Sequence, residues 1–261
     1  MAKRAGEKSI QARHDERRKK RIREQKMRRI AFFSFLALVA VLIVMFFTPL
    51  FNIKNVETVG NSRISNEEIT NTVGEIAGKN LFSYRKGKIK SRLGKIAYVD
   101  KVSVKKRVFP PTIVIDIKEC VPAFQAEYAG AFVVVDKPGK VLEQTAEKVE
   151  GVPVMEGVTI SSAKVGEAVA FKDAELQKTV MLCIENMDKA GILKDITVMS
   201  FADMTNITFN YQSRLDVICG THIDFQRKLA LFKEAVNSNK LTENSRGTIN
   251  LSTTGKAIYT P

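Results

Sequence analysis

The sequence RRIAFFSFLALVAVLIVMFFTPLFNIKNVETVGN, residues 28–61, contains the segment that decides how the rest of the chain is organised. Ile30–Phe51 has no charged residue, and only Ser34, Thr48 and Pro49 interrupt its apolar side chains. As a helix at 1.5 Å per residue it would span roughly 33 Å, about the hydrocarbon thickness of a bilayer. A soluble core helix of this length would have a polar stripe, and this one has none. We therefore predict a transmembrane helix over residues 30–51.

A cleaved secretory signal is the alternative for this segment. Such signals usually have a shorter apolar region, followed by small residues at a cleavage site. Here the apolar run continues to Thr48-Pro49-Leu50-Phe51 without a cleavage site of this kind. A retained anchor is therefore the preferred interpretation.

The residues before the predicted helix are strongly basic. Residues 1–29 contain 13 Lys and Arg against 4 Asp and Glu, so this tail has +9 of the chain's net charge of +14. Lys and Arg next to a membrane segment favour the cytoplasmic side. We therefore expect a cytoplasmic tail at residues 1–29, and a single-pass cell-membrane protein whose remaining residues lie outside.

A nucleic-acid-binding arm is the alternative use of these cations, because clustered Lys and Arg neutralise phosphates. The tail has no interleaved aromatic residues and no recognisable DNA-binding motif. A cytoplasmic tail that determines the membrane orientation and binds anionic lipid explains the same positive charge. No nucleic-acid partner is therefore expected.

Residues 52–121 have the pattern of a small β-α-α-β-β unit. A strand pattern ends at the Gly60-Asn61 turn. Ser65 and Glu68 then form a capping box for a helix whose apolar stripe (Ile69, Val73, Ile76) ends at Gly78. A second short helix is expected in residues 83–97, and two strands follow in residues 99–108 and 112–119, separated by a Pro-containing turn.

Residues 122–261 predict a second α+β domain that is richer in strands. A hairpin is expected in "AFVVVDKPGKVL", residues 131–142, and an amphipathic helix in residues 173–189. Further strands are expected at 196–201, 207–211, 215–219 and 247–251, with a helix in residues 224–238. The predicted fold class is therefore α+β: a single N-terminal transmembrane helix, a β-α-α-β-β domain and a strand-rich α+β domain.

This order of segments resembles the FtsQ/DivIB family of bacterial cell-division proteins, and the first exported unit resembles a POTRA (polypeptide-transport-associated) domain. The first matching stretches are "NIKNVETVGN", "SNEEI", "GKNLF", "VKKRVFPPTIVIDIKECVPA" and "FVVVDKPGKVL". Farther on, "VPVMEG", "LDVICG", "KLALFKEAV" and "GTINLSTTG" resemble the family's second, β domain. One departure is Asn250, where the family's terminal strand often has Asp.

The resemblance implies a function as a divisome scaffold. It implies FtsL-like and FtsB/DivIC-like bitopic partners, a connection to septal wall synthases, and enrichment at the division septum. Two alternatives from other classes are a POTRA-bearing translocation or chaperone component that binds unfolded chains, and a membrane-anchored wall-modifying enzyme. No outer-membrane barrel pattern follows the POTRA-like unit, which counts against the first alternative.

The expected partner site is the last strand candidate, because a strand added last often lies at a sheet edge and presents unpaired N–H and C=O groups to a partner strand. The resemblance implies the same terminal stretch. The residues expected to bind the partner are Thr248, Ile249, Asn250, Leu251, Ile258 and Tyr259. A closing strand of the core with a frayed tail is the alternative.

A second candidate surface is the basic stretch at residues 85–107, which has ten Lys and Arg against Asp100 alone. It is expected to face anionic lipid, anionic wall polymer or an acidic partner; a solvated helix face continuing into an exposed strand face is the alternative. The predicted electropositive patch consists of Arg85, Lys86, Lys88, Lys90, Arg92, Lys105, Lys106 and Arg107.

No enzymatic site is expected. Cys219, His222 and Asp224 place a thiol, an imidazole and a carboxylate close together, as nucleophilic catalysis could use. Cys219 however ends an apolar strand, and Asp224 occupies an expected helix N-cap. The three cysteines have neither a disulfide pattern nor metal-ligand spacing, and "VGEIAGKN" is no P-loop. We predict no catalytic residue, metal or cofactor.

Overall fold

The structure, a computed structural model, describes residues 2–46, 48–238, 241–242, 244–253 and 255–261. The chain divides into two compact units. Unit 1 comprises Met1–Glu57, Ile76–Lys86 and Lys105–Val114. Unit 2 comprises Thr58–Glu75, Gly87–Val104 and Ile115–Pro261.

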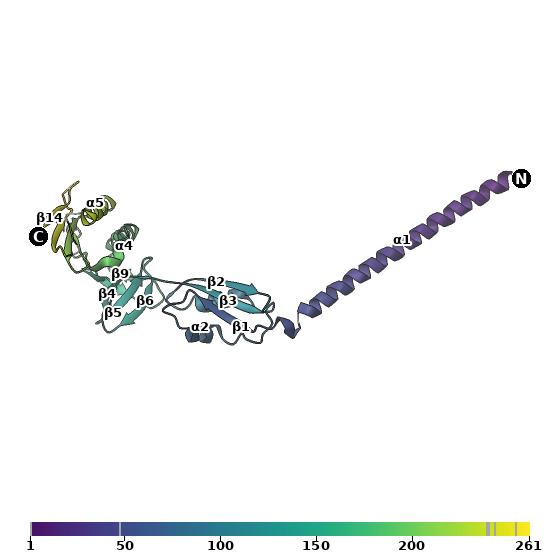
Figure 1. The fold of residues 1–261 in the computed structure, drawn as a ribbon, viewed down its shortest axis with the longest axis horizontal. Coiled ribbons are helices and arrows are strands. Elements are labelled where there is room, and N and C mark those ends of the chain that lie inside the picture. The colour runs from purple at the N-terminus through teal and green to yellow at the C-terminus, as the bar shows by residue number, and fades with distance from the viewer. Residues whose placement is uncertain (1, 47, 239–240, 243, 254) are drawn as a thin grey trace. The chain divides into compact units, whose positions relative to one another are not determined.

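The N-terminal helix α1 extends over Ala2–Phe46 (Figure 1). Within it, Arg23–Val44 is long enough to cross a membrane and contains an 18-residue stretch with a mean hydropathy of 2.2. The helix ends earlier than the predicted span: Thr48 is extended and a 3-10 turn, η1, follows at Pro49–Phe51. Proline has no N–H to continue a helix and restricts the residue before it to extended conformations, which explains the early end.

The predicted β-α-α-β-β order is confirmed. Its strands form a three-stranded sheet in the order β1-β3-β2. The elements are β1 (Asn55–Val59), α2 (Asn66–Val73), α3 (Lys86–Leu93), β2 (Val99–Arg107) and β3 (Thr112–Glu119). The apolar residues of the two helices, such as Ile69 and Leu93, are buried.

Helix α2 begins as predicted and ends earlier than predicted. The Ser65 hydroxyl accepts a hydrogen bond from the Glu68 N–H at 3.1 Å, as an N-cap does. The helix ends at Val73, because Gly74 has a φ of +75°, a value that glycine tolerates and that cannot continue a right-handed helix. Ile76 is buried, but it lies outside the helix.

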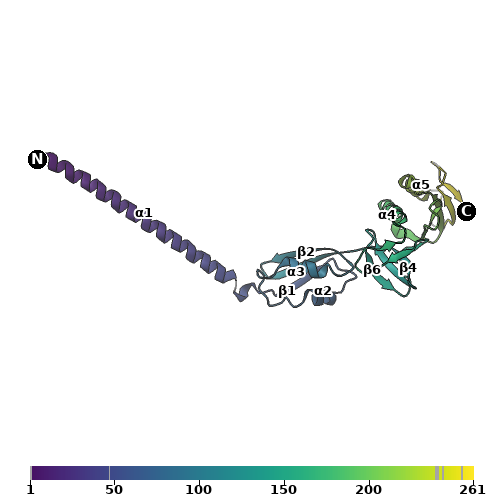
Figure 2. The same cartoon turned by 180° about the vertical axis from the view of Figure 1, so that it is seen from behind.

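Unit 2 contains a nine-stranded mixed sheet in the order β14-β13-β12-β11-β10-β7-β4-β5-β6, and a separate two-stranded sheet, β8-β9. Figure 2 labels β4 and β6 of the larger sheet. The strands of the larger sheet are β4 (Pro122–Tyr128), β5 (Ala131–Asp136), β6 (Val141–Thr145), β7 (Val154–Glu156), β10 (Ile196–Ser200), β11 (Ile207–Tyr211), β12 (Leu215–Gly220), β13 (Gly247–Asn250) and β14 (Ile258–Thr260). The smaller sheet consists of β8 (Ile160–Ser162) and β9 (Ala170–Phe171). The predicted strand-rich α+β architecture is thereby confirmed.

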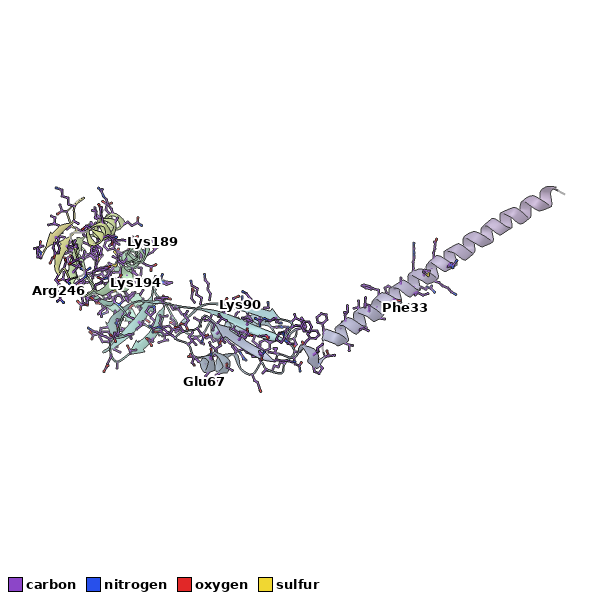
Figure 3. The ribbon with its side chains drawn as sticks, in the orientation of Figure 1. Phe33, Glu67, Lys90, Lys189, Lys194 and Arg246 are labelled. Atoms are coloured by element: carbon purple, nitrogen blue, oxygen red, sulfur yellow. The ribbon has the colours of Figure 1, made fainter. Side chains whose placement is uncertain are left out.

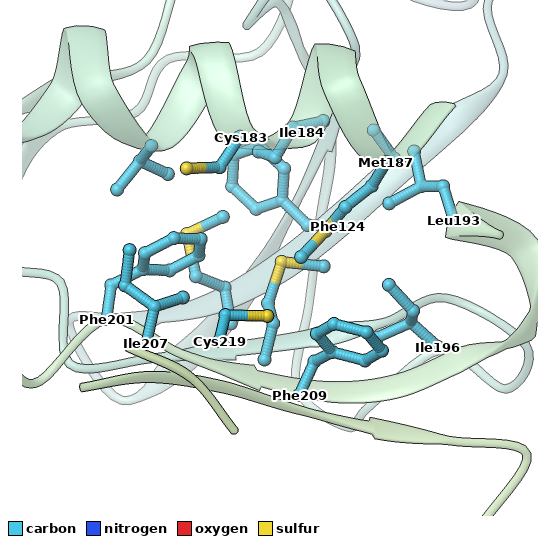
Figure 4. Close-up of a cluster of buried hydrophobic side chains, with 14 of the residues drawn as sticks. Phe124, Cys183, Ile184, Met187, Leu193, Ile196, Phe201, Ile207, Phe209 and Cys219 are labelled. Atoms are coloured by element: carbon cyan, nitrogen blue, oxygen red, sulfur yellow. The ribbon is translucent and has the colours of Figure 1, made fainter. Parts of the chain in front are cut away.

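Two helices, α4 (Ala174–Lys189) and α5 (Phe225–Asn237), pack against the larger sheet, and a 3-10 turn, η2 (Leu193–Asp195), leads into β10. Cys183 and Met187 of α4 point toward Phe209 and Cys219 of the sheet (Figure 4). These side chains are at most 2% exposed, so they form the interior of one continuous hydrophobic core.

Strand β4 was not predicted. It pairs with β5 on one side and with β7 on the other. Its central residue Gln125 is only 1% exposed, and its amide group hydrogen bonds to the carbonyls of Val149 and Val152 and to the Val149 N–H. A polar residue at a fully buried position hides the strand from a search for apolar alternation.

Candidate functional site

The predicted partner-binding strand is not the edge of the sheet. β13 pairs in parallel with β12 and antiparallel with β14. The expectation that residues 248–251 form the edge is therefore wrong. The chain turns after residue 251 and adds one more strand, β14, and no described strand lies beyond it (Figure 1).

Two hydrogen bonds fix which way the backbone of β13 points. The Leu251 N–H donates to the Ile218 carbonyl at 2.8 Å, and the Gly247 N–H donates to the Arg214 carbonyl at 3.2 Å. In a strand, the backbone groups of alternate residues point toward opposite neighbours. The odd-numbered residues of β13 therefore face β12, and the even-numbered residues face β14.

The same alternation identifies the backbone groups at the free edge. Thr248 lies opposite Thr260, and Asn250 lies opposite Ile258, so these pairs exchange the hydrogen bonds between β13 and β14. Tyr259, between them, has its N–H and C=O directed away from β13. This strand edge presents at least one backbone donor and acceptor to solvent.

The six residues predicted to bind a partner divide into buried and exposed sets. Ile249 and Leu251 are at most 1% exposed and belong to the core. Ile258 and Tyr259 are 49% and 37% exposed. Thr248 and Asn250 are half-buried, and the Asn250 side chain accepts hydrogen bonds from the N–H and hydroxyl of Ser252.

Local contacts hold β14 in place. The Tyr259 hydroxyl donates to the Arg246 carbonyl at 2.7 Å. Gly247 has a φ of +142°, and a Cβ at this position would collide with the Thr260 carbonyl oxygen. The close approach of β14 therefore requires glycine at position 247.

The predicted electropositive patch is divided between the two units. Arg85, Lys86, Lys105, Lys106 and Arg107 lie in unit 1, and Lys88, Lys90 and Arg92 lie in unit 2. Five of the eight side chains are exposed and make no hydrogen bond or ion pair with a described residue: Arg85, Lys86, Lys88, Lys90 and Lys105. Figure 3 shows one of them, Lys90, on α3.

The other three cations have structural contacts. Arg92 donates to the Val73 carbonyl at the end of α2. Lys106 donates to the Tyr84 carbonyl at 2.7 Å, and burial, followed by the neighbouring charge of Lys86, lowers the pKa of Lys106. Arg107 pairs with Glu57 at 3.0 Å. These three side chains are less available to a ligand than the exposed five.

The segment around Cys219 does not assemble a nucleophile. Cys219 is fully buried, and burial raises the pKa of its thiol to about 12. Asp224 occupies the N-cap of α5, but its side chain makes no capping hydrogen bond and its φ is +55°. Among the described residues, no group of three His, Cys, Asp or Glu side chains is arranged to hold a metal ion.

Glu119 is a structural residue that sequence reasoning missed. Its carboxylate accepts hydrogen bonds from the N–H groups of Ser62, Arg63 and Ile64 at 2.8–3.0 Å. Burial opposes ionisation of this carboxyl, but the three backbone donors outweigh it and hold its pKa below the usual value. The carboxylate thereby orders the segment between β1 and α2.

Comparisons with known proteins agree with this architecture. Residues 51–119 match the family model described as "POTRA domain, FtsQ-type". The chain is 26% identical over 230 residues to cell division protein DivIB of Clostridium tetani, covering 87% of this chain and 85% of the relative. It is 28% identical to DivIB of Clostridium acetobutylicum, covering 81% and 83%.

Two further proteins are similar. Cell division protein FtsQ of Corynebacterium glutamicum is 27% identical over 169 residues, covering 60% of this chain and 72% of the relative. The extracytoplasmic domain of DivIB from Geobacillus stearothermophilus aligns with a TM-score of 0.32 at 14% identity, covering 47% of this chain and 96% of that chain.

Proposed function

The resemblance to the FtsQ/DivIB division proteins is confirmed over most of the chain, and from this premise we propose that the protein is a non-enzymatic, bitopic scaffold of the bacterial division machinery. Its similarity to DivIB and FtsQ supports a role in cell division. Two observations support the scaffold role. The exposed strand β14 at the end of the sheet suits the binding of another protein. Cys219, the candidate nucleophile of the sequence, is buried in the core.

The proposed topology places residues 1–29 in the cytoplasm, a membrane span within residues 30–51, and two exported domains at residues 52–121 and 122–261. The apolar segment of α1 and the +9 charge of the tail support it. Protease added to intact protoplasts should digest the exported domains and leave a short anchored fragment. Protection of the large fragment would reverse the orientation.

The proposed partner site is the β14 edge, which includes two of the six predicted residues, Ile258 and Tyr259. The other four, Thr248, Ile249, Asn250 and Leu251, lie in or directly after β13, the strand that β14 covers. The observation that carries it is the position of β14 at the end of the nine-stranded sheet, with all three of its residues exposed. An extended segment of a partner can add to such an edge by main-chain hydrogen bonding. Ile258 and Tyr259 supply apolar contact beside it.

The proposed partners are FtsL-like and FtsB/DivIC-like bitopic division proteins, and further partners are septal wall synthases. Through these contacts the scaffold would regulate septal wall synthesis and be enriched at the division septum. The exposed cations Lys86, Lys88, Lys90 and Lys105 contribute to recruitment, so replacing all four with Glu should weaken midcell localisation of a fluorescent fusion. Unchanged localisation would leave these cations as an ordinary solvated surface.

The backbone direction of β14 provides a selective test of the partner site. Tyr259→Pro removes the N–H that points to the free edge, while the hydrogen bonds of Thr260 and Ile258 to β13 remain possible. Tyr259→Ala is the matched control, because it removes the same side chain and keeps the N–H. Capture of the FtsB/DivIC-like partner should fall strongly for Tyr259→Pro and less for Tyr259→Ala.

Two outcomes would contradict this assignment. Full capture by Tyr259→Pro would place the contact elsewhere. Equal losses for both variants would assign the contact to the tyrosine ring and not to strand addition. Circular dichroism and membrane abundance of each variant, measured in parallel, establish that the sheet is intact.

A further inference from the structure

Unit 1 contains a chain of four phenylalanine rings at the end of α1. Phe46, the last residue of the helix, contacts Phe51 and Phe82 with centroid separations of 5.6 and 4.7 Å. Phe51 in turn contacts Phe82 at 5.3 Å and Phe109 at 6.0 Å. We call these four residues the ring cluster. Only Phe51 is buried among them.

The apolar side chains of this region are unusually exposed. Phe109 is 68% exposed, Phe82 is 41% exposed and Phe46 is 42% exposed. Leu50, beside them in sequence, is 54% exposed, and Val108 is 37% exposed. A contiguous apolar surface of this kind marks a site that contacts protein or membrane.

Backbone and side-chain hydrogen bonds fasten the ring cluster to the end of the helix. The Asn80 side-chain amide donates to the Phe46 carbonyl at 2.9 Å, one of the carbonyls that a helix end leaves without a helical partner. The Leu81 N–H donates to the Phe51 carbonyl at 2.9 Å, which holds the segment containing Phe82 against η1. The exposed rings are therefore fixed near the helix terminus.

The ring cluster lies close to the hydrocarbon region of the membrane that α1 is proposed to cross. Helix α1 ends at Phe46 and the uncharged apolar run ends at Phe51, so the rings of both residues lie at the outer end of the membrane-spanning segment. If α1 crosses the bilayer, the ring cluster lies at the level of the lipid headgroups. Apolar and aromatic side chains of proteins that lie on membranes are found at this depth.

The charges of unit 1 beyond α1 complement an anionic lipid surface. Its Lys and Arg residues in this part are Lys54, Lys79, Arg85, Lys86, Lys105, Lys106 and Arg107. Glu57 is the one acidic residue there, and it is paired with Arg107. Seven cations against one carboxylate give this part a formal charge of +6.

We propose that this end of unit 1 docks on the outer surface of the membrane that α1 spans, with Leu50, Phe82 and Phe109 inserted among the lipid headgroups and the cations against anionic lipid. The docking orients the first exported domain at the membrane by a contact that is separate from the β14 edge. This docking proposal depends on the membrane span of α1 that belongs to the proposed function.

The sequence contains no tryptophan, so single introduced indoles report their own surroundings. The experiment reconstitutes the full chain in vesicles of equimolar phosphatidylglycerol and phosphatidylcholine, with and without brominated acyl chains. Phe109→Trp tests the proposal. Leu38→Trp tests insertion of α1, and Leu182→Trp, at a side chain that is 51% exposed on α4, reports an exposed position for which no membrane contact is proposed.

We expect the indole at position 38 to lose most of its emission to brominated lipid, the indole at position 109 to lose a smaller part, and the indole at position 182 to keep its emission. Quenching at position 38 without quenching at position 109 would overturn the docking and leave the span intact. Loss of quenching at both positions would overturn the span as well. If the indole at position 109 is shielded only after a purified FtsL-like partner is added, a protein covers the ring cluster and the lipid proposal fails.

Discussion

The hydroxyl of Tyr98 donates a hydrogen bond of 2.7 Å to Oε1 of Glu143, a residue 45 positions later in the chain. Tyr98 lies just before β2, and Glu143 lies in β6. Nearby, the Lys140 ammonium donates to the Val99 carbonyl at 3.1 Å. These contacts connect the POTRA-type segment with the strand-rich segment inside unit 2.

The Tyr98–Glu143 pair predicts a pH-dependent stability. Burial, and then the hydrogen bond and charge of Glu143, raise the pKa of Tyr98 above its ordinary value. The hydrogen bond of Tyr98 to Glu143 therefore contributes fully to the free energy of unfolding below the ordinary tyrosine pKa of about 10, and this contribution is lost as the pH rises above it. Tyr98→Phe should lower the free energy of unfolding by about 1 kcal/mol at neutral pH.

Urea unfolding of the detergent-solubilised chain measures this effect. The difference between the original chain and Tyr98→Phe should stay constant up to about pH 9 and should shrink as the pH rises above about 10. Tyr128→Phe is the control, because the Tyr128 hydroxyl makes no hydrogen bond to a described residue. A difference that stays constant with pH would show that the Tyr98 hydroxyl is not held in its neutral form.

Truncation of two cationic side chains of α3 should change the free energy of unfolding by different amounts. Arg92 donates to the Val73 carbonyl at the end of α2, whereas Lys90 is exposed. Arg92→Ala should lower the free energy of unfolding by about 1 to 2 kcal/mol, because a hydrogen bond from a charged donor is lost. Lys90→Ala should change it by less than about 0.5 kcal/mol. Equal effects in urea unfolding would contradict this separation of structural from free cations.

The three cysteines should resist a thiol reagent while the chain is folded. Burial raises the pKa of Cys183 and Cys219 to about 12, and burial together with a hydrogen bond to Asp136 raises that of Cys120 to about 11. Because the thiolate is the reactive form, labelling at about pH 8 should be slow and should become complete in urea. Fast labelling that Cys219→Ser abolishes would revive a nucleophilic role for this residue.

Local signals were sufficient to predict many elements. Ser65 caps α2 as predicted, and Asp173, at the start of the predicted helix, caps α4 through its Oδ1. Alternating apolar residues identified β3, in which Ile113, Ile115 and Ile117 are buried. Such patterns depend on residues close in sequence, so a single sequence contains them.

The features that were missed depend on contacts between distant residues. β14 has three exposed residues and no apolar alternation, and it is a strand only because it pairs with β13. The same pairing removes β13 from the sheet edge. The structural roles of Arg92 and Lys106 depend on backbone carbonyls 19 and 22 residues away, so the sequence showed only their charge.

The free edge of the sheet also predicts an exchange pattern along β14. The N–H groups of Ile258 and Thr260 face β13, so their hydrogen–deuterium exchange should be slow. The N–H of Tyr259 faces away from β13, so it should exchange quickly in the absence of a partner. Fast exchange at all three positions, or slow exchange at Tyr259 alone, would contradict the register on which the proposed partner site depends.

Gly247→Ala should abolish this pattern without unfolding the domain. The new Cβ would collide with the Thr260 carbonyl oxygen, and the φ of +142° is unfavourable for alanine, so β14 should separate from β13. Exchange at Ile258 and Thr260 should then become as fast as at Tyr259, while the amide of Val217 in the core strand β12 stays protected. Gly87→Ala is the control, since a Cβ there meets nothing within 4 Å. If β14 keeps its protection in Gly247→Ala, the close approach is not what holds this edge strand in place. If protection is lost and partner capture persists, the β14 edge is not the binding site.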